Sequence, residues 1–229
     1  MIPADRWKVA QNAELESSRA YEGRRPPTVD DLNQYFSAYF GLDLTSLTGK
    51  AILEVGCSPQ AAINSMNQTS LRVGLDPLSH AWRRYYQEDT NPVQGMGEFL
   101  PFKKDSFDVV LCLNVLDHVD LPRRVLMEMH RCLRKEGVMF VWLQTYATIE
   151  TIRRALDIVD LPHPHHLEDG DVASLVQELD MEIVVHRCDH MDIRKSVSVI
   201  RKGMILSGVK SLLANLLLGL RESSWLLKK

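Results

Sequence analysis

Two acids and a glycine stand where buried strands are expected to end. Glu54 and Gly56 lie in the run Ile52–Pro59, and Asp76 closes the next apolar run. A glycine lets the backbone approach a ligand closely, and the N–H groups of a following helix can bind its polar atoms. A carboxylate after the second strand can accept two hydrogen bonds from the diol of a ribose. This spacing predicts a nucleoside site; the alternative is that Gly56 only makes a tight turn and Asp76 only caps the next helix.

Histidines supply the candidate bases, because a histidine near its ordinary pKa can accept a proton at neutral pH. His118 follows the apolar run Phe107–Leu113 and should reach the same edge of the sheet. In the run His163–His166, we select His165 and His166 as further catalytic candidates, in a loop beside the pocket. The alternatives are a packing or capping role for His118 and an ordinary exposed loop for the run. We predict no metal site, because a proline crowds these histidines and no carboxylate or cysteine stands at ligand spacing.

Continuous apolar runs predict the strands that must position these residues. The expected strands are Ala51–Val55, Leu71–Leu75, Phe107–Leu113, Val138–Leu143, Glu182–Arg187 and Ser196–Arg201. Continuous rather than alternating hydrophobicity indicates strands covered on both faces. Helices are expected after Ser58-Pro59, over Pro122–Arg134 with Gly137 ending it, and over Asp169–Leu179. The alternation predicts a doubly wound α/β sheet.

Both ends of the chain differ from this pattern. Residues 1–49 are expected to form an N-terminal helical cap with helices over Trp7–Tyr21 and Asp30–Phe40, residues 50–202 the main domain, and residues 203–229 an amphipathic C-terminal helix. In the cap, Tyr35, Tyr39 and Phe40 either roof a substrate pocket or belong to the core.

The tail from Ile193 onward holds eight basic residues against one acid, Glu222. With Trp225 near its end, such a helix can lie in a membrane interface. The preferred alternative is that it packs on its own domain or on a partner subunit of a homodimer. The sequence leaves these interpretations open.

Composition narrows the classes of protein. The chain has 229 residues, 45% of them hydrophobic, which is enough for one sizeable core. A net charge of -3 gives no reason to expect a nucleic-acid partner. Four widely spaced cysteines favour reduced thiols, and neither a secretory signal nor a membrane span is seen. We therefore expect a cytoplasmic protein, at most peripheral to a membrane.

Several motifs together resemble a known family. Glu54-x-Gly56 and Asp76 are followed by Gly95–Phe102 and Asp105–Val110, then by Asn114–Val119 and Glu128-x-x-Arg131. This order is similar to class I S-adenosylmethionine-dependent methyltransferases of the type 11 branch. The resemblance is strong over Lys50–Leu143, weaker to about Arg201, and absent from the tail.

The resemblance implies a fold, a cofactor and an activity. The fold is a Rossmann-like doubly wound, mostly parallel seven-stranded sheet with helices on both faces. The cofactor is S-adenosylmethionine, with S-adenosylhomocysteine as product. The reaction is methylation, expected at an oxygen, of a small-molecule or glycan or lipid-linked acceptor.

The same resemblance implies the cofactor-binding residues. They are Glu54, Gly56, Cys57, Ser58, Asp76, Pro77, Met96, Gly97, Glu98, Asn114 and Val115. Gly56 and its neighbours are expected under the methionine part, Asp76 at the ribose, Met96 and Gly97 beside the adenine, and Asn114 at the amino-acid end. Ser58 and Gln60 depart from the family's glycine-rich turn, and Met96 replaces a common aspartate. These departures also fit a degenerate member that binds a ligand or partner without catalysis.

A nicotinamide-dependent oxidoreductase is the other enzyme class that uses a strand, a turn and an acid in this order. It normally carries Gly-x-Gly-x-x-Gly, which this chain lacks. It also leaves the segment from Leu100 to Asp108 unexplained. The methyltransferase interpretation is therefore preferred.

Overall fold

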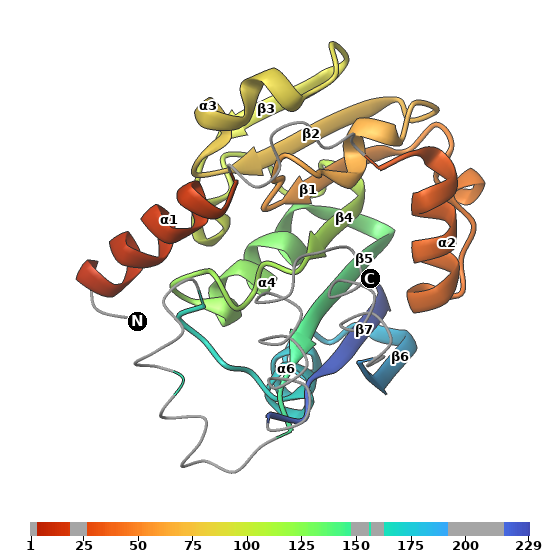
Figure 1. Ribbon diagram of the computed structural model, residues 1–229. Helices are drawn as coiled ribbons and strands as arrows, with labels where there is room; N and C mark the ends of the chain where they lie inside the picture. Colours follow the sequence, from red (N-terminus) through yellow and green to blue (C-terminus); the bar gives the residue numbers. More distant parts are fainter. Residues whose placement is uncertain (1–3, 19–26, 148–155, 157–162, 192–217) are drawn as a thin grey trace, which may run out of the picture.

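A seven-stranded sheet with the strand order β3-β2-β1-β4-β5-β7-β6 forms the centre of the protein (Figure 1). The structure is a computed structural model that describes residues 4–18, 27–147, 156, 163–191 and 218–229. The strands are β1 Ala51–Val55, β2 Leu71–Asp76, β3 Thr90–Gln94, β4 Phe107–Leu113, β5 Leu133–Thr145, β6 Glu182–His190 and β7 Arg221–Lys228. Strands β1 to β5 pair in parallel, and β7 runs antiparallel to both β5 and β6. The predicted doubly wound, mostly parallel sheet is confirmed.

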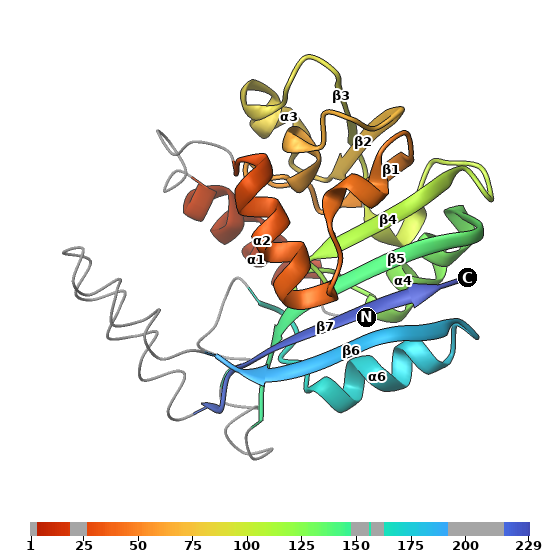
Figure 2. The same cartoon turned by 90° about the vertical axis from the view of Figure 1, so that its right-hand side faces the viewer.

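Helices cover both faces of the sheet (Figure 2). The α-helices are α1 Ala4–Ser18, α2 Val29–Phe40, α3 Ser79–Trp82, α4 Pro122–Cys132 and α6 Asp169–Gln177. The 3-10 turns are η2 Leu44–Leu47, η3 Ala62–Ser65, η4 Arg83–Tyr85 and η5 Gly97–Phe99. On one face, Met129 of α4 and Val176 of α6 pack with Val141 and Trp225. On the other face, Phe36 of α2 packs with Phe140, the residue of β5 that precedes Val141.

Every residue of β1 is buried, as its continuous apolar run predicts. Strands β1 and β4 have the predicted bounds, and β2, β5 and β6 extend beyond theirs. Strand β3 was missed, because the run Thr90–Gln94 is polar and contains Pro92. Gly137 was wrongly expected to end α4: the helix stops at Cys132, and Gly137 lies within β5.

The expected C-terminal helix is wrong for residues 221–228, which form strand β7 between β5 and β6. Trp225 pairs with Val141 and is fully buried, so its side chain does not meet a membrane interface. The leucine-rich pattern that predicted a helix lies mainly before β7, whose own sequence, Arg-Glu-Ser-Ser-Trp-Leu-Leu-Lys, holds only three consecutive apolar residues. Most of the tail and the strand expected over Ser196–Arg201 lie outside the described residues.

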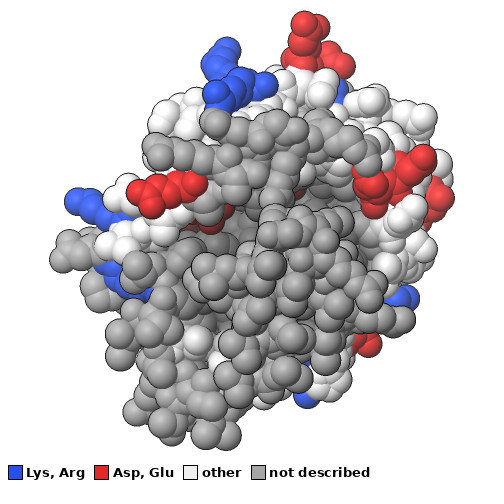
Figure 3. Space-filling view, viewed as in Figure 1, with Lys and Arg blue, Asp and Glu red and all other residues white. Residues whose placement is uncertain are grey.

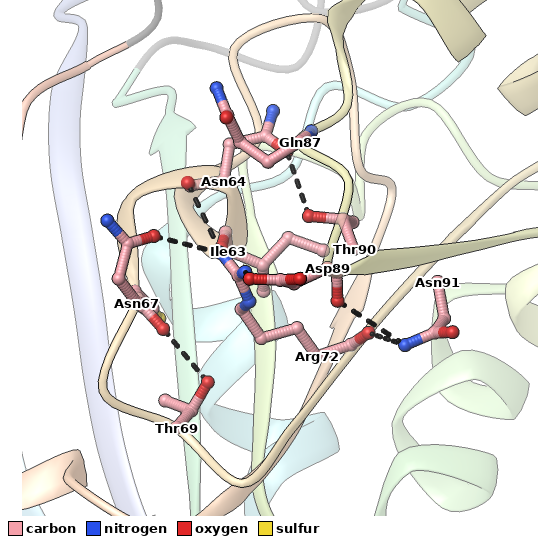
Figure 4. Close-up of polar contacts among 10 residues, drawn as sticks. Ile63, Asn64, Asn67, Thr69, Arg72, Gln87, Asp89, Thr90 and Asn91 are labelled. Atoms are coloured by element: carbon pink, nitrogen blue, oxygen red, sulfur yellow. Dashed lines mark hydrogen bonds and ion pairs between the residues drawn. The ribbon is translucent and has the colours of Figure 1, made fainter.

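The helix expected after Ser58-Pro59 is also wrong, because only the short η3 forms between β1 and β2. Arg72 of β2 is 4% exposed, and its guanidinium donates to the carbonyl oxygens of Ile63 and Asn64 at 3.2 and 3.4 Å (Figure 4). It also donates to the side chains of Asn67 and Asp89, each at 3.1 Å. The carbonyl groups of Ile63 and Asn64 bind Arg72 instead of the N–H groups of a following helical turn. Asn64 and Asn67 also favour turns over a helix.

The N-terminal cap is confirmed in part. Helix α2 begins with a capping box between Thr28 and Asp31 and ends at Gly41 in the left-handed conformation. Tyr35 and Tyr39 pack edge-to-face against Trp142 of β5, with ring centroids 5.7 and 5.5 Å from the Trp142 ring. These aromatic side chains therefore belong to the core.

Candidate active site

A cavity of about 320 Å³, including part open to solvent, lies at the carboxyl ends of β1, β2, β3 and β4. The lining residues are Trp7, Gln11, Val55, Gly56, Leu75, Pro77, Met96, Gly97, Glu98, Val115, His118 and Val119. This is the edge at which open α/β sheets bind ligands.

Gly56 turns the chain sharply at the floor of the cavity. Its φ is +77°, and the N–H groups of Gly56 and Cys57 both donate to the carbonyl of Leu75, at 2.7 and 3.2 Å. A Cβ at position 56 would lie 2.3 Å from a methyl carbon of Val115. Only glycine satisfies both the backbone conformation and this close approach.

Glu54 does not line the cavity. Its side chain is 4% exposed, and its two carboxylate oxygens accept the N–H groups of Ala62 and Ile63 at 3.1 and 2.9 Å. Burial raises the pKa of Glu54 to about 7, although these two hydrogen bonds act against the rise. The carboxylate therefore holds the segment after β1 against the strand.

Asp76 lies directly before Pro77 of the cavity wall. Its Oδ1 accepts the N–H of Leu78 at 2.7 Å and the indole N–H of Trp82 at 3.3 Å. Burial raises the pKa of Asp76 to about 6. Asp76 thus holds the turn before α3 but does not cap that helix, whose N-cap residue, Leu78, has no side-chain cap.

Cys57 and Ser58 shape the turn rather than the cavity wall. The Tyr86 hydroxyl donates to the Cys57 carbonyl at 2.7 Å, and its oxygen lies 3.2 Å from the Cys57 Sγ. Burial raises the pKa of the Cys57 thiol, so it is not a nucleophile at neutral pH. The Ser58 Oγ accepts the N–H of Gln60 at 3.2 Å.

Met96, Gly97 and Glu98 bring η5 against the cavity. Glu98 is 2% exposed, and its Oε1 accepts the N–H groups of Asp120 and Leu121 at 2.8 and 3.1 Å. Its carboxylate thereby fixes the segment that follows β4.

Asn114 and Val115 follow β4. Asn114 adopts a φ of +59°, and its N–H donates to the carbonyl of Trp142 at 2.6 Å. Its Oδ1 accepts the N–H of Gln144 at 3.4 Å. Val115 lines the cavity, whereas Asn114 is not among the lining residues.

Of the candidate bases, His118 lines the cavity, with a side chain 19% exposed. The His165 ring Nε2 lies 3.2 Å from the Asp120 carbonyl, and His166 is buried with its ring centroid 5.3 Å from that of Tyr146. Neither His165 nor His166 lines the cavity. His163, which the sequence analysis did not select, lies with its ring centroid 4.6 Å from that of His118.

Helix α1 supplies cavity residues that sequence reasoning missed. Trp7 and Gln11 line the cavity, and Figure 1 shows α1 beside the arrowheads of β1 and β2. Arg6 donates to the carbonyl of His163 at 3.2 Å, so α1 also contacts the loop after β5. Nothing in the polar sequence of α1 signals these long-range contacts.

Comparisons with known proteins agree with this geometry. Residues 53–141 match a family model described as a methyltransferase domain. A thiol S-methyltransferase of Homo sapiens is 35% identical over 109 residues, which cover 43% of this chain and 45% of that protein. A ubiquinone biosynthesis O-methyltransferase of Cronobacter sakazakii is 28% identical over 155 residues, 60% of this chain and 63% of that protein. The matched region thus spans less than two thirds of either relative.

Solved structures extend the likeness in fold. A phospholethanolamine N-methyltransferase of Haemonchus contortus, solved with S-adenosylhomocysteine, has a TM-score of 0.69 at 12% identity and covers 94% of this chain and 57% of that chain. The cyclase SpnF has a TM-score of 0.60 at 12% identity, covering 90% and 98%. One fold therefore occurs with different reactions. Residues 53–141 match the methyltransferase domain family, and the sheet around them has the fold of the solved methyltransferase named above.

Proposed function

We propose that this chain binds S-adenosylmethionine in the cavity and transfers its methyl group to an oxygen of a small-molecule or glycan or lipid-linked acceptor. The observation that carries the proposal is the cavity itself. It lies at the carboxyl ends of β1 and β4, the adjacent strands between which the strand order of the sheet reverses. Gly56, Met96 and Val115 line it, as the family resemblance implies. Methyltransferase relatives that methylate oxygen and sulfur support the same activity.

The residues present suit a nucleoside with a charged tail. Val55, Leu75 and Val119 offer apolar wall to a base and a thioether chain. Both hydrogen bonds that Asp76 accepts from its own chain end on Oδ1, so Oδ2 can accept from a ribose hydroxyl. The tight turn at Gly56 lets the ligand approach the backbone.

When bound, the cofactor supplies an electrophilic methyl group on a sulfonium. The chain has to align the acceptor atom with that methyl and exclude water. Trp7 and Gln11 of α1 wall off one side of the cavity. His118 can accept the proton of an acceptor hydroxyl, which favours an oxygen over an atom that needs no base.

A second candidate function is ligand binding without catalysis. It is favoured by Glu54, whose carboxylate accepts the N–H groups of Ala62 and Ile63 and does not line the cavity. The departures at Ser58 and Met96 point the same way. Methyl transfer from labelled S-adenosylmethionine to hydroxyl-bearing acceptors distinguishes the two functions once binding is established.

Calorimetric titration of the full chain with S-adenosylmethionine and S-adenosylhomocysteine tests the site. We expect dissociation constants in the micromolar range, about -8 kcal/mol. Val115→Phe fills the cavity and should abolish binding, whereas Val184→Phe, at an exposed position of β6, should leave it unchanged. Absence of binding at millimolar ligand, or equal binding by the folded Val115→Phe variant, would refute the proposal.

A further inference from the structure

We propose that Asp117, His118 and His163 form a binding site for a first-row divalent metal ion at the edge of the cavity. Among the described residues, one ligand atom from each of the three lies within 4.8 Å of the other two. Two imidazoles and a carboxylate are a donor set that suits zinc and its first-row neighbours. Asp117 and His118 are neighbours in the sequence, and His163 lies more than forty positions after them.

The distances fit ligands around an ion better than they fit hydrogen bonds. The Asp117 Oδ1 lies 3.8 Å from the His118 Nε2, and the Asp117 Oδ2 lies 4.0 Å from the His163 Nε2. Both exceed the length of a hydrogen bond. Metal bonds of about 2.0–2.2 Å place neighbouring ligand atoms roughly 3–3.5 Å apart in a tetrahedron, so side-chain movements below about 1 Å complete the site.

Asp117 gives independent support. Its side chain is 4% exposed, and its buried Oδ1 has no hydrogen-bond partner among the described residues. A buried carboxylate oxygen without a partner costs free energy, and such oxygens in native proteins are paired or coordinate metals. A cation between Asp117 and the two histidines removes this cost.

The surrounding chain holds the two segments together. The N–H of His165 donates to the Asp117 carbonyl at 3.2 Å, and the His165 ring lies at the same distance from the Asp120 carbonyl. Glu98 fixes Asp120 from below, and Arg6 of α1 holds the His163 carbonyl. His165, expected to be catalytic, thus has contacts suited to positioning His163.

Glu14 of α1 can act as an outer partner. Its Oε2 lies 4.0 Å from the His118 Nδ1, the ring nitrogen on the side away from Asp117. A histidine that ligates a metal commonly donates its other ring N–H to a carboxylate, which orients the ring. Helix α1 therefore contributes to the cavity wall and to the orientation of His118.

The position of the site suggests its role, and this part of the inference rests on the proposed function. His118 also lines the cavity, so an open coordination position can face an acceptor there. A bound cation lowers the pKa of a hydroxyl oxygen that it coordinates, which generates the oxygen nucleophile near neutral pH. His118 would then be a ligand rather than the proton acceptor, and the proton of the acceptor hydroxyl would leave to solvent.

Metal titration of the full chain tests the site without reference to activity. After treatment with a chelator, the wild type should bind one Zn²⁺ per chain by calorimetry, and Co²⁺ should give the visible absorption of a protein-bound ion. Glu14→Gln, which removes only the outer partner, should lose about 10–100-fold in metal affinity. His163→Ala and Asp117→Asn, which remove a ligand, should lose more than that. His80→Ala, which removes an exposed histidine that is not part of the cluster, should bind as the wild type does.

Two outcomes overturn the proposal: no stoichiometric binding by the wild type, or equal affinity in folded Asp117→Asn and wild type. Circular dichroism establishes that each variant is folded, and Asp117→Asn keeps the shape of the side chain if His163→Ala does not fold. The S-adenosylmethionine titration above is measured separately. If the wild type binds the cofactor but not zinc, only the metal site is rejected. If the wild type binds zinc but not the cofactor, only the proposed function is rejected.

Discussion

At the scale of single residues, much of the family-like sequence stabilises the frame of the site. Arg131 donates to Glu128 at 2.8 Å and to the carbonyl groups of Leu100 and Phe102 at 3.0 and 2.8 Å. Asp108 accepts the N–H of Ala51 at 2.8 Å. These motif residues place η5 and β1 correctly but do not contact the cavity. A motif match therefore reports positioning residues as well as binding residues.

Replacing Gly56 tests the turn at the floor of the cavity. We expect Gly56→Ala to lower the free energy of unfolding by about 1–3 kcal/mol, because alanine disfavours a φ of +77° and its Cβ meets Val115. Urea denaturation measures the change. The matched control is Gly170→Ala in α6, where a Cβ meets no atom within 4 Å and alanine favours the helix. Equal effects of the two substitutions would contradict the described turn.

The residues of the site were predictable to different degrees. Gly56, Met96 and Val115 line the cavity as expected, because their motifs lie at strand ends whose position the parallel sheet determines. Trp7 was not predictable, since it reaches the cavity from a helix far away in sequence. His163 was overlooked because its partner Asp117 is distant along the chain.

At the scale of elements, the strands that sequence predicts best are the buried parallel ones. Strands β1 and β4 read as continuous apolar runs, and both were found with their bounds. Strand β3 lies at the sheet edge, where a polar sequence with Pro92 is tolerated. Strand β7 forms by pairing with β5 and β6, which are distant in sequence, so its local sequence does not predict a strand.

The buried strand β7 predicts a large effect at Trp225. Trp225→Ala should lower the free energy of unfolding by about 3–5 kcal/mol, because it removes a fully buried aromatic ring between β5 and β6. Trp225→Phe should cost less than about 1.5 kcal/mol, because the indole Nε1 has no hydrogen-bond partner among the described residues. Thermal or urea unfolding distinguishes the two variants. A small cost for Trp225→Ala would instead indicate an exposed tail.

At the scale of the whole molecule, the described surface carries charges of both signs. Figure 3 shows acidic and basic side chains interspersed around the margin of one face. No helix within the described ranges is long and apolar enough to cross a membrane. Buried carboxyl groups also affect global stability, among them those of Glu54 in β1 and Asp76 in β2.

Burial of Glu54 predicts a pH dependence of global stability. The carboxyl group has a pKa of about 7 in the folded chain, against an ordinary value of 4.5. Between these values the folded state binds more protons than the unfolded state, so the contribution of Glu54 to the free energy of unfolding falls as the pH rises. For a shift of this size the loss is on the order of 3 kcal/mol between pH 4.5 and pH 8.

Comparison with Glu54→Gln isolates this contribution. His130 acts in the opposite direction, because burial lowers its pKa, whereas Asp76, whose pKa burial raises to about 6, acts in the same direction as Glu54. Both groups are common to the two proteins, so their contributions largely cancel in the difference between the two unfolding free energies. That difference should shift in favour of Glu54→Gln as urea denaturation is repeated from pH 5 to pH 8. A constant difference would mean that Glu54 ionises at its ordinary pKa, and therefore that water reaches the carboxylate that anchors the turn beside the cavity.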